Sequence, residues 1–397
     1  KIDIDGGIGT MFVFASKGRR EMPEGHVMTD GAFEALGKTG AFGGQHIYTP
    51  RLGVALHINA FNFPVWGMLE KIAPALLAGV PSIVKPATAT AHVTELAVRL
   101  MLDAGVLPDG ALQLVTGGVG DALDHLGAQD CLPFTGSAST ARMLRGHSGL
   151  LDRSVPFTAE QDSLNASILG PDAVPGTPEF NILIKEVARE MTTKAGQKCT
   201  AVRRILAPEP LIQPLIEGLS ARLSKVVVGD PRSDGVRMGS VVSLSQRRDV
   251  LEKAEIIGRE ADLVFGGQDG FAPQGDLDKG AFVAPHLFHC ADPDAAEHIH
   301  STEAFGPVST LLPYRDLDHA CALANRGQGS LVASLITHDG ETARRVVEGI
   351  GAWHGRVYIN NRDSAAEATG HGAPMPHLTH GGPGRAGGGE ELGGIRA

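Results

Sequence analysis

Residues 53–64 read Gly-Val-Ala-Leu-His-Ile-Asn-Ala-Phe-Asn-Phe-Pro and predict a strand that runs into a helix. The segment 53–58 is a mostly apolar run, the pattern of a strand covered on both faces of a sheet. The helix expected after Pro64 ends at Gly79, a residue type that commonly terminates helices. Its apolar face consists of Val65, Leu69, Ile72, Ala73 and Leu76.

The same alternation continues along the next 80 or so residues. Short apolar strands are expected at 82–85, 112–115 and 131–134, each followed by a helical segment. Alternating strands and helices predict an α/β fold with a doubly wound parallel sheet. Ligands on such sheets bind beyond the carboxyl ends of the strands. Four residues fall at such ends, namely Asn62, Lys85, Gly117 and Gly136.

The second half has the same alternating pattern. Further strands are expected at 168–169, 205–207, 226–228, 263–265, 331–336 and 357–359. Helices are expected between them at 211–224, 245–259, 317–325 and 342–349. The glycine-dense tail, 381–394, has the composition of a loop, and Gly6–Gly9 is interpreted as a turn rather than a phosphate-binding loop.

One cysteine follows a predicted helix in a way that suggests chemistry. The periodic run 180–191 leads into Gly196, which permits backbone conformations that other residues resist, and then into Cys199. Lys194 and Lys198 flank the thiol and would favour its reactive thiolate form. A free cysteine is more often a small buried residue, so this stretch alone leaves both readings open.

Length and composition limit the class of protein. A chain of 397 residues can hold two domains, and its net charge of −10 gives no support to nucleic acid or a membrane surface as partner. No apolar run reaches membrane-spanning length. The cysteines lack metal or disulfide spacing, so we expect a cytoplasmic protein without a metal site. They are Cys131, Cys199, Cys290 and Cys321.

Several short motifs occur in an order that resembles the aldehyde dehydrogenase superfamily over nearly the whole chain. They lie at 61–64, 85–87, 134–137, 160, 196–200 and 303–308. The resemblance implies a Rossmann-like NAD(P)-binding domain over 1–157, with an oligomerisation hairpin near 43–51. It implies a catalytic domain over 158–355 and a returning C-terminal segment over 356–397.

The resemblance also assigns catalytic roles. Cys199 would be the nucleophile, because a thiolate attacks electrophilic carbon even when only partly populated. The Asn62 side-chain amide and the Cys199 backbone N–H would stabilise the oxyanion. Glu160 would deprotonate the hydrolytic water. The residues after Glu160, Gln-Asp-Ser-Leu, differ from the family's usual Leu-Gly-Gly-Lys.

By the same resemblance, eight residues would bind the cofactor. They are Lys85, Thr88, Gly117, Gly120, Gly136, Ser137, Glu303 and Phe305. NAD-preferring relatives carry a glutamate where this chain has Thr88. A carboxylate there would repel the 2′-phosphate of NADP, so we expect NADP as cofactor, with NAD as the alternative.

A closer resemblance concerns the substrate. Residues 57–67, 162–165 and 381–391 resemble the subfamily that oxidises CoA-linked semialdehydes in phenylacetate and benzoate degradation. That resemblance implies oxidation to the carboxylic acid through a cysteine thiohemiacetal and thioester. Two alternatives remain: a CoA-acylating semialdehyde dehydrogenase, and a truncated cofactor-binding protein without activity.

The family normally has a segment before the position of Lys1 and a final strand beyond that of Ala397. We therefore expect this chain to be part of a longer protein, with its oligomerisation strands partly missing. By resemblance the full-length protein forms a homo-oligomer, and some relatives carry a fused hydratase domain.

Overall fold

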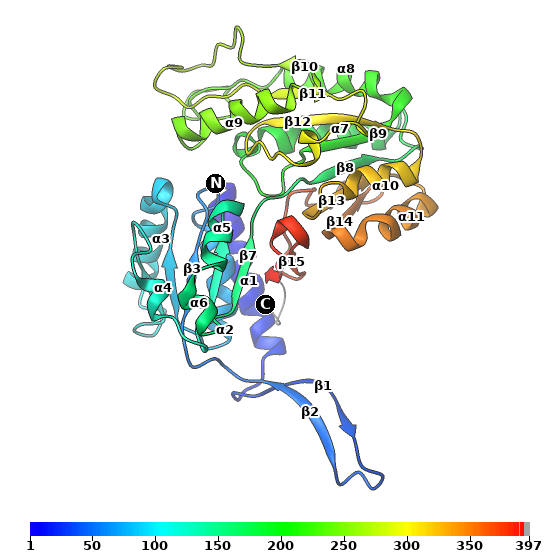
Figure 1. The fold of residues 1–397 in the computed structure, drawn as a ribbon. Coiled ribbons are helices and arrows are strands. Elements are labelled where there is room, and N and C mark those ends of the chain that lie inside the picture. Colours follow the sequence, from blue (N-terminus) through cyan, green and yellow to red (C-terminus); the bar gives the residue numbers. More distant parts are fainter. Residues whose placement is uncertain (389, 393–397) are drawn as a thin grey trace. The chain divides into compact units, whose positions relative to one another are not determined.

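The computed structural model describes residues 1–388 and 390–392 and divides the chain into two compact units (Figure 1). The first consists of residues 1–159, 375–379 and 390–392, and the second of 160–374 and 380–388. Each unit contains a largely parallel sheet with helices packed on it, so the predicted α/β fold is confirmed. No helix in this described part of the chain is long and apolar enough to cross a membrane.

The sheet of the first unit has five strands in the order β5-β4-β3-β6-β7. Their bounds are β3 Ala55–Ile58, β4 Ser82–Lys85, β5 Leu112–Leu114, β6 Leu132–Thr135 and β7 Phe157–Glu160. β3 pairs in parallel with both β4 and β6, and β4 pairs in parallel with β5. The carboxyl ends of these four strands therefore lie along one edge. The chain order reverses between β3 and β6, the place where such sheets bind ligands.

Helices connect and cover these strands. They are α1 Ile2–Glu21, α2 Trp66–Leu77, α3 Ala91–Asp103, α4 Ala122–His125, α5 Ala138–Arg145 and α6 Ser148–Asp152, with the 3₁₀ turn η1 Thr88–Thr90 and the short strand β16 Glu390–Leu392. The turn predicted at Gly6–Gly9 is wrong, because these residues lie inside α1. A Cβ on Gly7 would come within 3.1 Å of the Trp66 Cα, so glycine here permits close packing of α1 on α2. The Asp3 carboxylate accepts hydrogen bonds from the first amides of α2, at 3.1 and 2.9 Å.

An antiparallel hairpin extends from the first unit (Figure 1). It consists of β1 Met28–Ala35 and β2 Gly43–Tyr48. The hairpin-like element predicted at 43–51 is therefore present as β2, and its partner strand is the preceding segment, which the sequence pattern did not reveal. Several large apolar side chains on the hairpin are exposed, among them Phe33, Leu36, Phe42 and Ile47.

The second unit has a seven-stranded sheet in the order β10-β11-β12-β9-β8-β13-β14. The bounds are β8 Ala166–Leu169, β9 Arg204–Pro208, β10 Asp262–Gly266, β11 His286–His289, β12 Val308–Tyr314, β13 Ser330–Ile336 and β14 His354–Asn360. All neighbouring pairs are parallel except β10 with β11. The sequence did not predict β11 or β12. The strand predicted at 226–228 is wrong, because only an isolated bridge from Val228 to Met238 forms there.

Helices cover both faces of this sheet, as a doubly wound fold requires. The helical segments are α7 Pro178–Thr192, α8 Ile212–Leu223, α9 Leu244–Ile257, α10 Leu317–Asn325 and α11 Gly340–Ile350, with 3₁₀ turns η2 Thr193–Gly196, η3 Glu209–Leu211, η4 His298–His300, η5 Gly351–Trp353 and η6 Gly384–Ala386, and a short strand β15 His380–Gly381. One apolar cluster includes α7 and α8, and a second includes α9, α10 and α11. The predicted helix at 180–191 is confirmed as the buried part of α7.

Candidate active site

The predicted nucleophile lies on a strained loop between α7 and β9. Lys194, Ala195 and Gly196 all have left-handed backbone angles, with φ of 54°, 52° and 69°. A Cβ on Gly196 would lie 2.1 Å from the Gly306 carbonyl oxygen, so glycine is required there, as its sequence position suggested. Left-handed residues other than glycine are costly and persist where the surroundings fix them. This geometry places Cys199 just before the amino end of β9.

The Asn165 side chain anchors the Cys199 loop through hydrogen bonds to its backbone. Its Nδ2 donates to the carbonyl oxygens of Cys199 and Ala201, at 2.8 and 2.9 Å. Its Oδ1 accepts from the Ser163 hydroxyl at 2.7 Å and from the Val332 amide at 3.1 Å. Asn165 is fully buried, so these bonds are shielded from water and hold the backbone on both sides of Thr200.

Arg203 also anchors this loop by hydrogen bonds, and it joins the loop to the segment that contains Glu303 and Phe305. Its guanidinium donates to the carbonyls of Gly196 and Lys198 at 3.0 and 3.1 Å, and to Gly306 at 2.8 Å. The same group lies 5.5 Å from the centre of the Phe305 ring and 3.5 Å from Glu303 Oε1. These two predicted cofactor residues are therefore connected to the nucleophile loop through Arg203.

One of the two lysines that the sequence placed beside the thiol has another partner, and two arginines interact with Cys199. The Lys198 ammonium is buried and forms an ion pair with Glu190 at 2.5 Å, which compensates its charge. Two arginines, the buried Arg203 and the partly buried Arg356, interact electrostatically with Cys199. Burial lowers the pKa of Arg203 and of Arg356, and the attraction of Cys199 is among the effects that oppose this. Nearby guanidinium charge favours the thiolate form of a cysteine.

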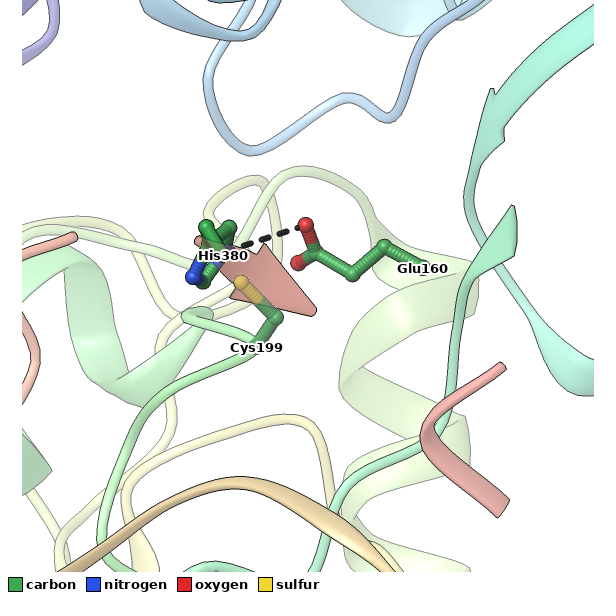
Figure 2. A group of neighbouring side chains, drawn as sticks. All are labelled: Glu160, Cys199 and His380. Atoms are coloured by element: carbon green, nitrogen blue, oxygen red, sulfur yellow. Dashed lines mark ion pairs between the residues drawn. The ribbon is translucent and has the colours of Figure 1, made fainter. Parts of the chain in front are cut away.

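Glu160 and Cys199 come together with a third residue, His380 (Figure 2). Glu160 and His380 are only 2% and 6% exposed, and Glu160 Oε2 lies 3.1 Å from His380 Nε2. A ligand atom of each of the three side chains lies within 4.8 Å of the other two. Cys199 and Glu160 were predicted from the sequence as site residues, whereas His380, which the fold brings beside them, was not; its only signal was its place directly before the glycine-dense tail.

The tail reaches Glu160 because two distant segments are joined by hydrogen bonds. The Gln161 amide donates to the Ala386 carbonyl at 3.1 Å, and its side chain donates to the Arg385 carbonyl at 3.1 Å. The Arg385 guanidinium in turn donates to Asp162 at 3.0 Å. These bonds fix residues 380–386 beside 160–162 and thereby place His380.

A thiol, an imidazole and a carboxylate are also ligand types that zinc prefers. The sequence predicted no metal site, because such predictions rely on closely spaced ligands. Cys199, Glu160 and His380 are far apart along the chain and meet only through folding, and together they could hold a metal ion.

The predicted cofactor residues of the first unit gather at the carboxyl edge of its sheet. Lys85 ends β4, and burial lowers the pKa of its amine. Ser137 caps α5 just after β6, and its hydroxyl accepts a hydrogen bond from the Thr140 amide at 3.2 Å. The remaining predicted cofactor residues of this unit are Thr88 in η1, Gly117 and Gly120 after β5, and Gly136 after β6. Asn62, the predicted oxyanion donor, follows β3 at the same edge. A cation and a helix N-terminus at the reversal point of the sheet fit a diphosphate-bearing nicotinamide cofactor.

The fold and the Cys199–Glu160 pair point to one class of enzyme, and comparison with known proteins agrees. The model of the aldehyde dehydrogenase family matches residues 3–394. This chain therefore belongs to the aldehyde dehydrogenase family, whose members oxidise aldehydes with a nicotinamide cofactor.

Two relatives of known sequence share nearly half of the aligned residues. The 3,4-dehydroadipyl-CoA semialdehyde dehydrogenase of Aromatoleum evansii is 48% identical over 382 residues, which are 96% of this chain and 74% of that protein. Protein MaoC of Klebsiella aerogenes is 48% identical over 161 residues, 40% of this chain and 47% of that protein.

Solved structures show the same fold at lower identity. Succinic semialdehyde dehydrogenase of Streptococcus pyogenes, in complex with NADP+, is 22% identical with a TM-score of 0.82, covering 99% of this chain and 79% of that one. Betaine aldehyde dehydrogenase of Staphylococcus aureus, in complex with NAD+, is 23% identical with a TM-score of 0.82, covering 99% and 73%.

Proposed function

We propose that this enzyme oxidises a CoA-linked semialdehyde from phenylacetate or benzoate breakdown to the carboxylic acid, with NADP as cofactor. The observation that carries the substrate class is the 48% identity to the Aromatoleum semialdehyde dehydrogenase over 96% of this chain. Candidate substrates are 3,4-dehydroadipyl-CoA semialdehyde and 3-oxo-5,6-dehydrosuberyl-CoA semialdehyde.

The first chemical step is attack of the Cys199 thiolate on the aldehyde carbon, which forms a thiohemiacetal. The positive charges of Arg203 and Arg356 favour the Cys199 thiolate. The backbone of the Cys199 loop is held in place by the hydrogen bonds from Asn165 to the carbonyls on both sides of Thr200. The Asn62 amide and the Cys199 N–H are the proposed donors to the oxyanion, and such donors contribute roughly 3–4 kcal/mol each to transition-state stability.

Lys85, Thr88, Gly117, Gly120, Gly136 and Ser137 would hold the adenosine and diphosphate part of the cofactor, and Glu303 and Phe305 the nicotinamide part. A nicotinamide held there would supply the hydride acceptor, and loss of hydride from the thiohemiacetal would leave a thioester on Cys199. The packing of Phe305 and Glu303 on Arg203 supports this assignment, because it fixes both residues to the nucleophile loop.

In the last step Glu160 removes a proton from water, whose oxygen bonds to the thioester carbon. The carbon–sulfur bond breaks, the acid leaves and Cys199 is regenerated. The buried position of Glu160 beside Cys199 favours hydrolysis over transfer of the acyl group to free CoA, because water requires a base to attack a thioester at a useful rate. The CoA-acylating reaction is the alternative within this family.

Glu160→Gln tests the proposal. We expect the variant to give one burst of reduced cofactor and then to accumulate the thioester on Cys199, visible by intact-protein mass spectrometry. A steady-state rate equal to wild type would mean that another group serves as base. Formation of a new CoA thioester from added free CoA by the wild type would favour the acylating alternative. A folded wild-type protein that binds the cofactor but oxidises no aldehyde would favour the inactive alternative.

A further inference from the structure

The Glu160–His380 pair is buried, unlike the ion pairs on the surface of the protein. The two facing atoms, Glu160 Oε2 and His380 Nε2, lie 3.1 Å apart, and both residues are almost completely buried. A hydrogen bond to a charged group is stronger in such surroundings than in water. His380 therefore lies within hydrogen-bonding distance of Glu160, the carboxylate beside Cys199 in Figure 2.

The segment that carries His380 is fixed on several sides. β14 packs against it so closely that a Cβ on Gly355 would lie 1.7 Å from the Gly381 carbonyl oxygen. The Arg385 amide donates to the Gln328 carbonyl at 3.0 Å, and the Arg385 side chain binds Asp162. His380 is therefore presented to Glu160 by a rigid backbone, which is what precise orientation of a catalytic group requires.

We propose that His380 is a positioning residue for Glu160 in hydrolysis of the thioester. Its Nε2–H donates to Glu160 Oε2, which holds the carboxylate oriented toward the acylated Cys199. The proton of the attacking water goes to the Glu160 carboxylate as the new carbon–oxygen bond forms and the carbon–sulfur bond breaks. This inference rests on the proposed role of Glu160 as the base.

If His380 positions Glu160, it should affect only one of the two half-reactions, the hydrolysis that releases the acid. Hydride loss from the thiohemiacetal does not require a base for water, whereas release of the acid does. We expect His380→Phe to keep the rate of the first burst of reduced cofactor within about twofold of wild type. Its steady-state kcat should fall about ten- to hundredfold, the size expected when a hydrogen bond to a charged group is lost, and the thioester should accumulate.

His380→Gln distinguishes loss of the hydrogen bond to Glu160 from a general disturbance of folding or packing. Glutamine offers an amide N–H at nearly the same reach as Nε2, so it should restore most of the lost kcat. The matched control is His338→Phe, because His338 also pairs with a carboxylate, that of Asp363 at 3.0 Å, but on the surface of the same unit. The control variant should turn over like wild type.

Several results would overturn the inference. One is an equal fall of burst rate and kcat in His380→Phe, and another is a glutamine variant as slow as the phenylalanine one. The third is slower alkylation of Cys199 by iodoacetamide in His380→Phe, which would assign the histidine to the thiol instead. Glu160→Gln is measured in parallel: if it accumulates thioester and His380→Phe does not, only this inference fails. If Glu160→Gln turns over normally, the proposed base and its positioning residue both fail.

Discussion

The Asn165 side-chain amide donates to the carbonyls of both Cys199 and Ala201, and so ties the nucleophile loop to the strand region that begins at β8. Because Asn165 is fully buried, its loss leaves several polar groups without partners. We expect Asn165→Leu, which keeps the volume, to lower the free energy of unfolding by about 2–5 kcal/mol, since each buried unsatisfied group costs about 1–3 kcal/mol.

The same variant should lower kcat at least tenfold, because a nucleophile displaced by a fraction of an ångström loses its aligned attack. Denaturant unfolding and steady-state kinetics measure the two effects. Asn181→Leu is the control, since the Asn181 amide makes a single exposed bond to the Thr177 carbonyl on α7. If Asn165→Leu matched that control in both measurements, the anchoring role would be wrong.

Cys199 should be the reactive cysteine. Burial raises the pKa of Cys290 to about 11 and also raises the pKa of Cys131 and Cys321, so these thiols stay protonated near neutral pH. We expect iodoacetamide to modify Cys199 first, with loss of activity in proportion, and Cys199→Ala to abolish oxidation while cofactor binding persists. Cys131→Ser should retain activity. Peptide mapping that found another cysteine modified during inactivation would contradict the assignment.

Glu303 makes a pH-dependent contribution to stability. Burial raises the pKa of this carboxyl from 4.5 to about 8, against the attraction of Arg203 and with a further upward contribution from Asp162. The folded protein therefore holds a proton that the unfolded chain releases near pH 4.5. The stability that this proton supports is present below about pH 4.5 and is lost as the pH rises through about 8.

Glutamine cannot ionise. As the pH rises from about 4.5 to about 8, we therefore expect the free energy of unfolding to fall less in Glu303→Gln than in the wild type. The difference should be at least about 1.4 kcal/mol, the equivalent of one pKa unit. Denaturant unfolding at a series of pH values measures it. Parallel stability curves for the two proteins would mean that folding does not raise the pKa of Glu303.

Zinc should inhibit the enzyme through the cluster of Cys199, Glu160 and His380. The three donor atoms lie close enough together to bind one ion, and a thiolate bound to zinc cannot attack an aldehyde. We expect micromolar-range Zn²⁺ to inhibit reversibly, EDTA to restore activity, and His380→Phe to weaken inhibition about tenfold or more. Mg²⁺, which prefers oxygen ligands, is the control. Equal zinc sensitivity of wild type and His380→Phe would exclude this cluster.

The alternation of strands and helices was readable from the sequence because it depends on local apolar periodicity. Gly6–Gly9 was misread, since its glycines serve contact between α1 and α2 rather than a turn, and that contact is invisible without the fold. β11 and β12 were missed because nearly all of their residues are buried, so neither strand has an alternating apolar pattern.

The same limit applies to the site. Cys199 and Glu160 were found from motifs, and the left-handed conformation of Gly196 followed from its residue type. Arg203 and His380 contact partners that are distant in sequence, such as Gly306 and Glu160, and no local pattern marks such pairs. Lys198 was assigned to the thiol by proximity along the chain, yet its ammonium pairs with Glu190.

Cofactor preference can be tested at Thr88. This residue is exposed at the start of η1, three positions after Lys85 at the end of β4. The 2′-phosphate of NADP carries roughly two negative charges near neutral pH, comparable to a phosphorylated side chain. Lys85 would attract this group, and the Thr88 hydroxyl would donate to it without adding negative charge. We therefore expect the native enzyme to prefer NADP.

Thr88→Glu should reverse or reduce that preference, because its carboxylate repels the phosphate and accepts hydrogen bonds from the free ribose hydroxyls of NAD. Since like-charge contacts can cost several kcal/mol, the ratio of kcat/KM for the two cofactors should shift tenfold or more toward NAD, at about 1.4 kcal/mol per decade. Thr88→Gln, which has similar size and no charge, separates repulsion from bulk and should shift the ratio much less. Native preference for NAD, or equal shifts in the glutamate and glutamine variants, would reject the electrostatic role of this position.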